Sequence, residues 1–183
     1  MMHPERTIRE DETWREHSTG FGSVSVFLTN AEGKLLMVQD LDKFGGKWSP
    51  VAGYIDDLDH EEPEMTALRE AKEEMGLDIR LDELLGVWHY YDKSADHTDK
   101  VHMHVGYAYT GTILGGTYKM QKEEIQHYGF FSPEDVETMH DKGLLKTPQY
   151  NYVGFKLWES GKRYPRTLIQ TNGVSHDRPY RKS

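Results

Sequence analysis

The strongest constraint on this chain is the stretch 67–77, which reads ALREAKEEMGL and places three carboxylates at helical spacing. Residues three and four positions apart share one face of a helix, so Glu70, Glu73 and Glu74 would stand together and repel one another. A hard divalent cation held by carboxylate oxygens would offset that repulsion. Arg69 could brace one of the glutamates as a bidentate partner. A solvated acidic helix is the alternative that spacing alone leaves open.

The residues around this stretch predict where the helix begins and ends. Pro63 suits the first helical position, where its missing N–H costs no hydrogen bond. Gly76 is suited to end the helix in a left-handed conformation, with Leu77 as the apolar contact beyond it. We expect the side chains that face the core to be Met65, Leu68, Ala71 and Met75.

Together with Glu61, this stretch resembles the Nudix box, the signature of the Nudix hydrolase family. The family pattern is G-x5-E-x7-R-E-U-x-E-E-x-G-U, with U aliphatic. Here Glu61 and residues 69–77 match every fixed position, with Ala71 as a small aliphatic residue. Gly53 fits the leading glycine, but residues 54–60 make this loop two residues longer than the pattern. That departure concerns the geometry of the loop and the fit of the substrate, and it leaves the carboxylate helix intact.

The resemblance covers about residues 20–140 and implies an α/β fold, an α/β/α sandwich with a mixed β-sheet between helices. The mixed order of strand and helix patterns along the chain agrees with that class. Outside the box, the resemblance depends on residues 48–50 ahead of the loop, on 124–125 and on 130–135.

The resemblance also implies a set of site residues and a Mg²⁺ cofactor, for which Mn²⁺ could substitute. The implied metal ligands are Glu70, Glu73, Glu74 and the carbonyl group of Ala52. The implied catalytic residues are Glu70, as a further ligand or as a base, Arg69, which would lock a glutamate, and Glu124. The residues expected beside the substrate are Trp48, Gly53, Tyr54 and Glu61.

The activity implied by the resemblance is hydrolysis of a pyrophosphate bond in a nucleoside diphosphate linked to another moiety. A pyrophosphate repels anionic nucleophiles, and bound Mg²⁺ would neutralise the developing charge and lower the pKa of a bound water. Nucleoside triphosphates, nucleotide sugars and dinucleotides stay open as substrates. Two other classes compete with the hydrolase: a Nudix-fold sensor that binds a nucleotide without turnover, and an interaction module.

Charge and composition limit the partners of the chain. The net charge of −9 argues against a nucleic-acid binder, which needs a basic footprint. The chain has no cysteine, which excludes disulfides, thiolate zinc sites and a cysteine nucleophile. The first twenty residues lack the apolar core of a signal peptide, and no apolar run approaches the roughly 18 residues of a membrane span. We therefore expect a cytoplasmic protein with a small nucleotide as partner and no membrane.

The expected organisation is an N-terminal arm over residues 1–20, a Nudix hydrolase domain over 21–159 and a basic tail over 160–183. The tail holds six basic residues and one acidic residue, so it carries +5 while the rest of the chain carries −14. This asymmetry suggests that the tail lies on the acidic body, either of its own subunit or of a partner in a homodimer. A solvated tail is the alternative.

Alternation of apolar and polar residues predicts strands over 22–29, 34–39, 84–91 and 101–110, and the glycine-rich stretch 111–116 is expected to be a turn or bulge. We expect the first two strands to pair as a hairpin. Later helices are expected after an N-cap at Ser132 and over 151–160. The apolar stripe of the last helix would consist of Tyr152, Phe155 and Trp158.

Overall fold

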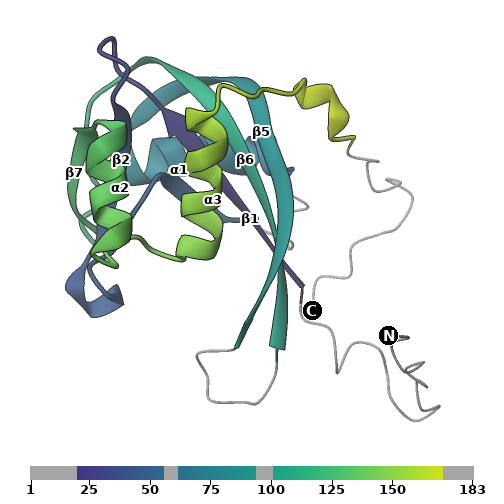
Figure 1. Ribbon diagram of the computed structural model, residues 1–183. Helices are drawn as coiled ribbons and strands as arrows, with labels where there is room; N and C mark the ends of the chain where they lie inside the picture. The colour runs from purple at the N-terminus through teal and green to yellow at the C-terminus, as the bar shows by residue number, and fades with distance from the viewer. Residues whose placement is uncertain (1–19, 56–61, 94–100, 171–183) are drawn as a thin grey trace, which may run out of the picture.

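The computed structural model describes residues 20–55, 62–93 and 101–170, which form strands enclosed by helices (Figure 1). The strands are β1 (Gly20–Leu28), β2 (Leu35–Asp40), β3 (Trp48–Ser49), β4 (Val51–Tyr54), β5 (Leu77–Lys93), β6 (Val101–Gly116) and β7 (Ile125–Phe131). The helices are α1 (Pro63–Met75), α2 (Pro133–Asp141) and α3 (Pro148–Glu159), with short 3-10 turns η2 (Asp42–Phe44) and η3 (Arg166–Leu168). No helix in the described ranges has the length and apolar character needed to cross a membrane.

The strands form two sheets, in the orders β4-β1-β6-β5 and β3-β2-β7. The larger sheet is mixed, because β1 runs parallel to β6 while its other pairings are antiparallel. The expected hairpin of β1 and β2 is wrong. The two strands lie in different sheets and are joined by an isolated bridge between Thr29 and Leu35. The turn between β1 and β2 does not make them partners, because β1 forms longer hydrogen-bonded ladders with β4 and β6 than the single bridge to β2.

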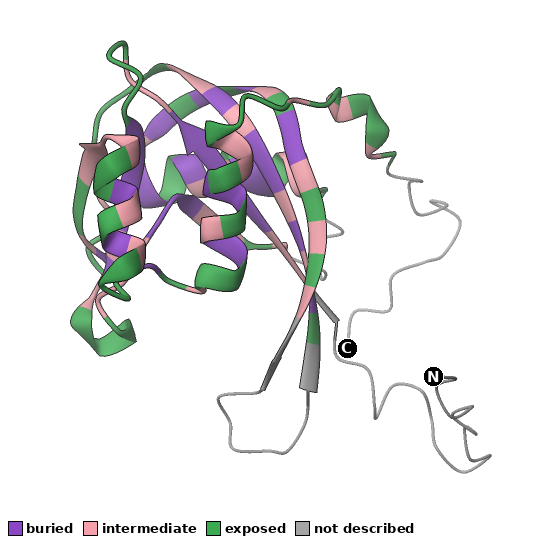
Figure 2. Cartoon of the chain, viewed as in Figure 1, coloured by how far each residue is buried: buried purple, intermediate pink, exposed green. Residues whose placement is uncertain are grey.

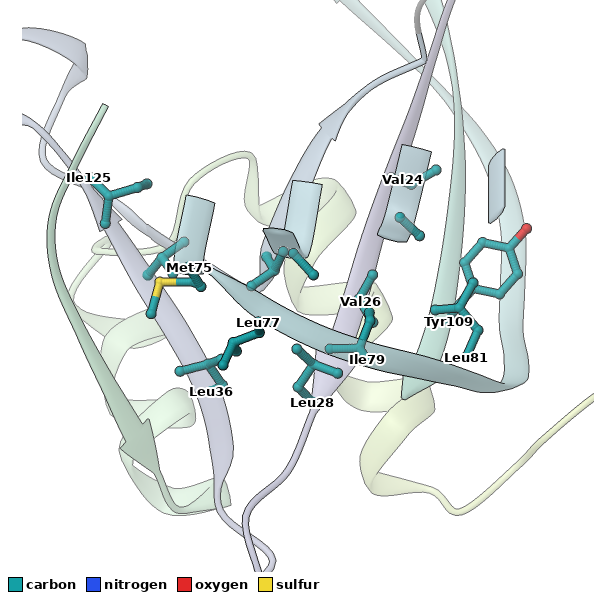
Figure 3. Packing of buried hydrophobic residues seen from close by; sticks show 14 of the residues in the cluster. Val24, Val26, Leu28, Leu36, Met75, Leu77, Ile79, Leu81, Tyr109 and Ile125 are labelled. Atoms are coloured by element: carbon teal, nitrogen blue, oxygen red, sulfur yellow. The ribbon is translucent and has the colours of Figure 1, made fainter. Parts of the chain in front are cut away.

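Two hydrophobic cores lie on opposite faces of the strands, because successive side chains of a strand point to opposite sides. Val24, Val26 and Leu28 of β1 belong to the core beneath α1 (Figure 3), whereas Phe27 belongs to the core that includes Phe155 of α3. Figure 1 shows α2 and α3 on the near side of the strands and α1 on the far side, and Figure 2 shows the buried residues concentrated between these layers. The predicted α/β/α sandwich with a mixed sheet is therefore confirmed.

Both predicted ends of α1 are confirmed, but its predicted core face is half wrong. Pro63 is the first helical residue, and Gly76 ends the helix with a φ of 69°. Met65 and Leu68 are 59% and 43% exposed, whereas the buried face consists of Thr66, Ala67, Ala71, Glu74 and Met75. The helix lies so close to the strands that small side chains fill most of this face, and the longer apolar residues point outward.

The stretch 111–116 is strand rather than turn. β6 continues to Gly116, which pairs with Leu77 at the start of β5. The register shifts where Asp78 pairs with Gly115 and Ile79 pairs with Ile113, so the expected bulge is confirmed while the turn is not. Hydrogen bonding to a long partner strand therefore outweighs the local turn preference of these residues.

Of the two later helices, α2 begins where its capping residue indicates and α3 begins earlier than expected. Ser132 and Asp135 form a capping box at the start of α2, as the N-cap assignment predicted. α3 begins at Pro148, three residues earlier than expected, after Thr147 in a left-handed conformation. Its buried residues are Tyr150, Asn151, Gly154 and Phe155, and the expected Tyr152 and Trp158 are half-buried beside them.

α3 packs so closely on β6 that a methyl group at Gly106 would displace it. A Cβ atom at Gly106 would lie 1.8 Å from Cε2 of Tyr150, whereas a Cβ at Gly115 of the same strand meets no atom within 4 Å. Overpacking of this kind costs about 1–3 kcal/mol. We expect Gly106→Ala to lower the free energy of unfolding by that amount in urea titrations, and Gly115→Ala to change it by less than about 0.5 kcal/mol. Equal effects of the two substitutions would contradict the packing described.

Candidate active site

A cavity of about 800 Å³ lies where α1, β4 and the segment before α3 meet. Its lining includes most of the predicted site residues: Ala52, Gly53, Tyr54, Arg69, Glu70, Glu73, Glu74 and Glu124. A cavity of this size is within the range of small-molecule sites in proteins. The carboxylates that the sequence placed on one helix face therefore do face a common space.

Glu74 is the most deeply buried carboxylate of this helix, with 7% of its surface exposed. Its Oε2 accepts a hydrogen bond from the backbone N–H of Ala52 at 3.3 Å. Burial, together with the charge of Glu70, raises the pKa of Glu74 well above its ordinary value. A positive charge in the cavity would therefore stabilise the ionised form of this side chain.

Arg69 joins two of the other carboxylates. Its Nη1 donates to Glu70 Oε1 at 2.8 Å and to Glu73 Oε2 at 2.7 Å, and its Nη2 donates to the carbonyl oxygen of Tyr54 at 3.2 Å. Burial nevertheless raises the pKa of Glu70, because the loss of solvent outweighs the attraction of the Arg69 guanidinium. The planar guanidinium thus ties the acidic face of α1 to the end of β4.

Gly53 permits this arrangement because it has no side chain. A Cβ atom there would lie 1.9 Å from Oε1 of Glu70. The backbone of β4, which is held in register by pairing Gly53 with Val24 of β1, can therefore approach the helix directly. The contact between Gly53 and the substrate that the sequence suggested stays a prediction.

The cavity also contains an ion pair that the sequence analysis did not select. Asp40, at the end of β2, is buried, and its Oδ2 lies 2.8 Å from Nζ of Lys146. Tyr90, Tyr150 and Asn151 line the same cavity. None of these residues belongs to a local motif, and they come together through sheet and helix packing between segments far apart in the chain.

One described residue expected beside the substrate, Trp48, does not line the cavity. Trp48 is absent from the described residues that line it, and packs instead edge-on against Phe131, with ring centroids 4.9 Å apart. Trp48 is half-buried and packs against the core that also contains Phe155, so its expected place beside the substrate stays a prediction. Glu61 lies outside the described residues.

The donor chemistry of the cavity fits a hard divalent cation. As the side chains lie in this structure, no three His, Asp or Glu residues of the described ranges are gathered closely enough to hold a metal, and Arg69 engages both Glu70 and Glu73. Carboxylate oxygens are nevertheless the ligands that Mg²⁺ prefers. Burial raises the pKa of Glu70 and of Glu74, so a bound cation would stabilise the ionised form of both carboxylates.

Comparison with known proteins agrees with this geometry. The family model described as NUDIX domain matches residues 21–150. The structure resembles a NUDIX hydrolase from Nitrosomonas europaea, with a TM-score of 0.68, 19% identity and coverage of 84% of this chain and 97% of that one. No curated protein sequence matches the chain.

Two further solved structures have ADP-ribose in their descriptions. One is an ADP-ribose pyrophosphatase from Streptococcus suis, with a TM-score of 0.58, 22% identity and coverage of 79% of this chain and 93% of that one. The other is the NUDIX domain of Shewanella oneidensis NrtR complexed with ADP ribose, with a TM-score of 0.61, 18% identity and coverage of 82% and 94%. At these identities the likeness concerns the fold.

Burial of Glu74 predicts a pH-dependent stability. Because its pKa is raised on folding, ionisation of Glu74 destabilises the folded protein, and its contribution to stability is lost as pH rises above the ordinary value of 4.5. We expect Glu74→Gln, measured in EDTA, to raise the melting temperature at neutral pH and to flatten its decline as pH rises above the ordinary value of 4.5. The exposed Glu73 is the matched control, and Glu73→Gln should produce no such gain. A lower melting temperature for Glu74→Gln across this range would refute the assignment.

Proposed function

The chain belongs to the NUDIX domain family and is a Nudix-type hydrolase, and from that premise we propose that it cleaves a pyrophosphate bond with Mg²⁺ as cofactor. The proposed substrate is a nucleoside diphosphate linked to another moiety. The observation that carries the proposal is the buried Glu74 and the half-buried Glu70 beside Arg69, in a cavity large enough for a nucleotide.

The residues proposed to hold the metal are Glu70, Glu73, Glu74 and the Ala52 carbonyl group. Their support is that all four residues line one cavity and that oxygen is the donor Mg²⁺ prefers. When bound, Mg²⁺ would neutralise phosphate charge and lower the pKa of a coordinated water, and Mn²⁺ could take its place.

A carboxylate of the cavity is proposed to take the proton of the attacking water. Glu70 and Glu124 are the two candidates, and they are near enough that the charge of Glu124 contributes to the raised pKa of Glu70. A raised pKa makes a carboxylate a better base near neutral pH. In the reaction, the water oxygen forms a bond to phosphorus, the bridging P–O bond breaks, and the proton passes to the carboxylate.

Arg69 is proposed to act as a positioning residue, since its contacts are to protein groups. It fixes Glu70 and Glu73 relative to each other and to the Tyr54 carbonyl group. Tyr54 is exposed at the edge of the cavity, with its ring centroid 6.4 Å from that of His104, and is proposed to contact a nucleobase or sugar of the substrate.

ADP-ribose, nucleoside triphosphates, nucleotide sugars and dinucleoside polyphosphates all contain the proposed linkage. Supporting ADP-ribose are the descriptions of two similar structures, one a pyrophosphatase and one a complex. The proposed test incubates the protein with each class, with Mg²⁺ or with EDTA, and follows the release of phosphate or of phosphorylated products. Turnover of one class that disappears in EDTA is the expected result. Tight binding without turnover of any class would favour a nucleotide sensor instead.

Removing the carboxylates should abolish that turnover. We expect the double variant Glu73→Gln and Glu74→Gln to reduce kcat by at least about 100-fold, because two of the proposed metal ligands lose their charge. Glu134→Gln is the matched control, since Glu134 is an exposed glutamate of α2 outside the cavity. Activity that survives in the double variant would show that the reaction does not depend on this helix face.

Arg69→Lys tests the positioning role. Lysine keeps the positive charge but cannot reproduce the planar fork that reaches two carboxylates and a carbonyl group. We expect kcat to fall by about 10- to 100-fold, with a smaller change in KM, because the geometry of the carboxylates is altered and not the charge. An increase in KM at unchanged kcat would instead indicate that Arg69 binds the substrate directly.

A further inference from the structure

Lys146 is the basic residue of the cavity that lies outside α1. Among the described residues that line the cavity, Arg69 and Lys146 are the two with cationic side chains, and Arg69 already bonds to Glu70 and Glu73. The Lys146 side chain is 51% exposed, with its ammonium 2.8 Å from the buried Asp40 carboxylate. An ammonium has three N–H donors, so the pairing with Asp40 leaves donors for a ligand.

The backbone of Lys146 is held from two sides. Its N–H donates to the carbonyl oxygen of Trp48 at 2.8 Å, and its own carbonyl oxygen accepts from Nδ2 of Asn151 at 2.5 Å. The buried Asn151 therefore serves the backbone of this segment from the first turns of α3. These two hydrogen bonds fix the backbone from which the Lys146 side chain extends toward the cavity.

The next residue is in an unusual conformation. Thr147 has a φ of 42° and is the only non-glycine residue of the described ranges with a positive φ. Such a conformation costs about 1–3 kcal/mol and persists where the surroundings enforce it. It turns the chain from Lys146 into α3, and Thr147 itself lines the cavity. The strained residue Thr147 therefore directly follows Lys146, the second cationic residue that lines the cavity.

A cation at this position favours the entry of an anion into a cavity that is rich in carboxylates. Asp40, Glu70, Glu74 and Glu124 all line it, and carboxylates repel phosphate groups. The N-terminal end of α3, a helix of 12 residues, reaches the same region through Tyr150 and Asn151, and the positive end of its dipole adds to the charge of Lys146.

We propose that Lys146 binds a phosphate group of the substrate and that Asp40 is a positioning residue that holds the Lys146 ammonium at the cavity. The inference rests on the proposed function, because it names a residue that receives one phosphate of the pyrophosphate linkage. The carboxylates of α1 and the ammonium before α3 then act on different parts of the substrate.

The test measures binding of inorganic pyrophosphate by calorimetry, at low salt, once in EDTA and once in Mg²⁺. We expect Lys146→Met to weaken binding about tenfold or more, and Lys146→Arg to retain it within about threefold. Lys34→Met removes an equal charge from an exposed lysine outside the cavity and should leave the affinity unchanged.

A second variant separates binding from folding. Lys146→Met leaves the buried Asp40 without its cation, so it can destabilise the protein. Asp40→Asn combined with Lys146→Met removes both charges and should restore the melting temperature but not pyrophosphate binding. Restored binding in this double variant, unchanged affinity in Lys146→Met, or no binding by the unmodified protein in either buffer would each overturn the inference.

The outcome is separable from that of the proposed function. If pyrophosphate binding depends on Lys146 while no compound of the substrate panel is turned over, the hydrolase reaction fails and the phosphate site stands. If turnover is observed and Lys146→Met changes neither KM nor pyrophosphate affinity, the reaction stands and the assignment of Lys146 is wrong.

Discussion

The close approach of α1 to β4 is the constraint on which the cavity depends. Gly53 leaves room for Glu70 against the backbone of the strand, and Ala67 and Ala71 let the helix lie low on the sheet. The same approach buries Glu74 and raises its pKa. Close packing of α1 on β4 therefore both shapes the cavity and buries a carboxylate whose ionised form a cation would stabilise.

Local signals predicted the parts of the fold that local interactions decide. The ends of α1 follow from Pro63 and Gly76, and the start of α2 follows from the capping box at Ser132. The outward positions of Met65 and Leu68 were missed, because hydropathy does not report how near a helix lies to its sheet. The partners of β1 were missed for a related reason, since a turn joins two segments without fixing which ladder each strand enters.

The residues of the site likewise fall into a group that local spacing predicts and a group that tertiary packing brings together. Glu70, Glu73 and Glu74 share a helix face, so their convergence is readable from their spacing. Asp40 and Lys146 come from a strand end and a loop far apart in the chain, and no spacing rule connects them. Their pairing arises from tertiary packing, which places the end of β2 beside the segment that enters α3.

The junction between α1 and β5 has a mechanical consequence. The helix ends at Met75 and the strand begins at Leu77, with Gly76 as the single residue between them. No loop therefore separates the helix from the strand, so the position of one constrains the position of the other. One inserted residue that shifted the register of β5 against β6 would turn the apolar side chains of β5 to the opposite face of the sheet. The single-residue connection therefore leaves no loop in which a change of chain length could be absorbed without moving α1 or β5.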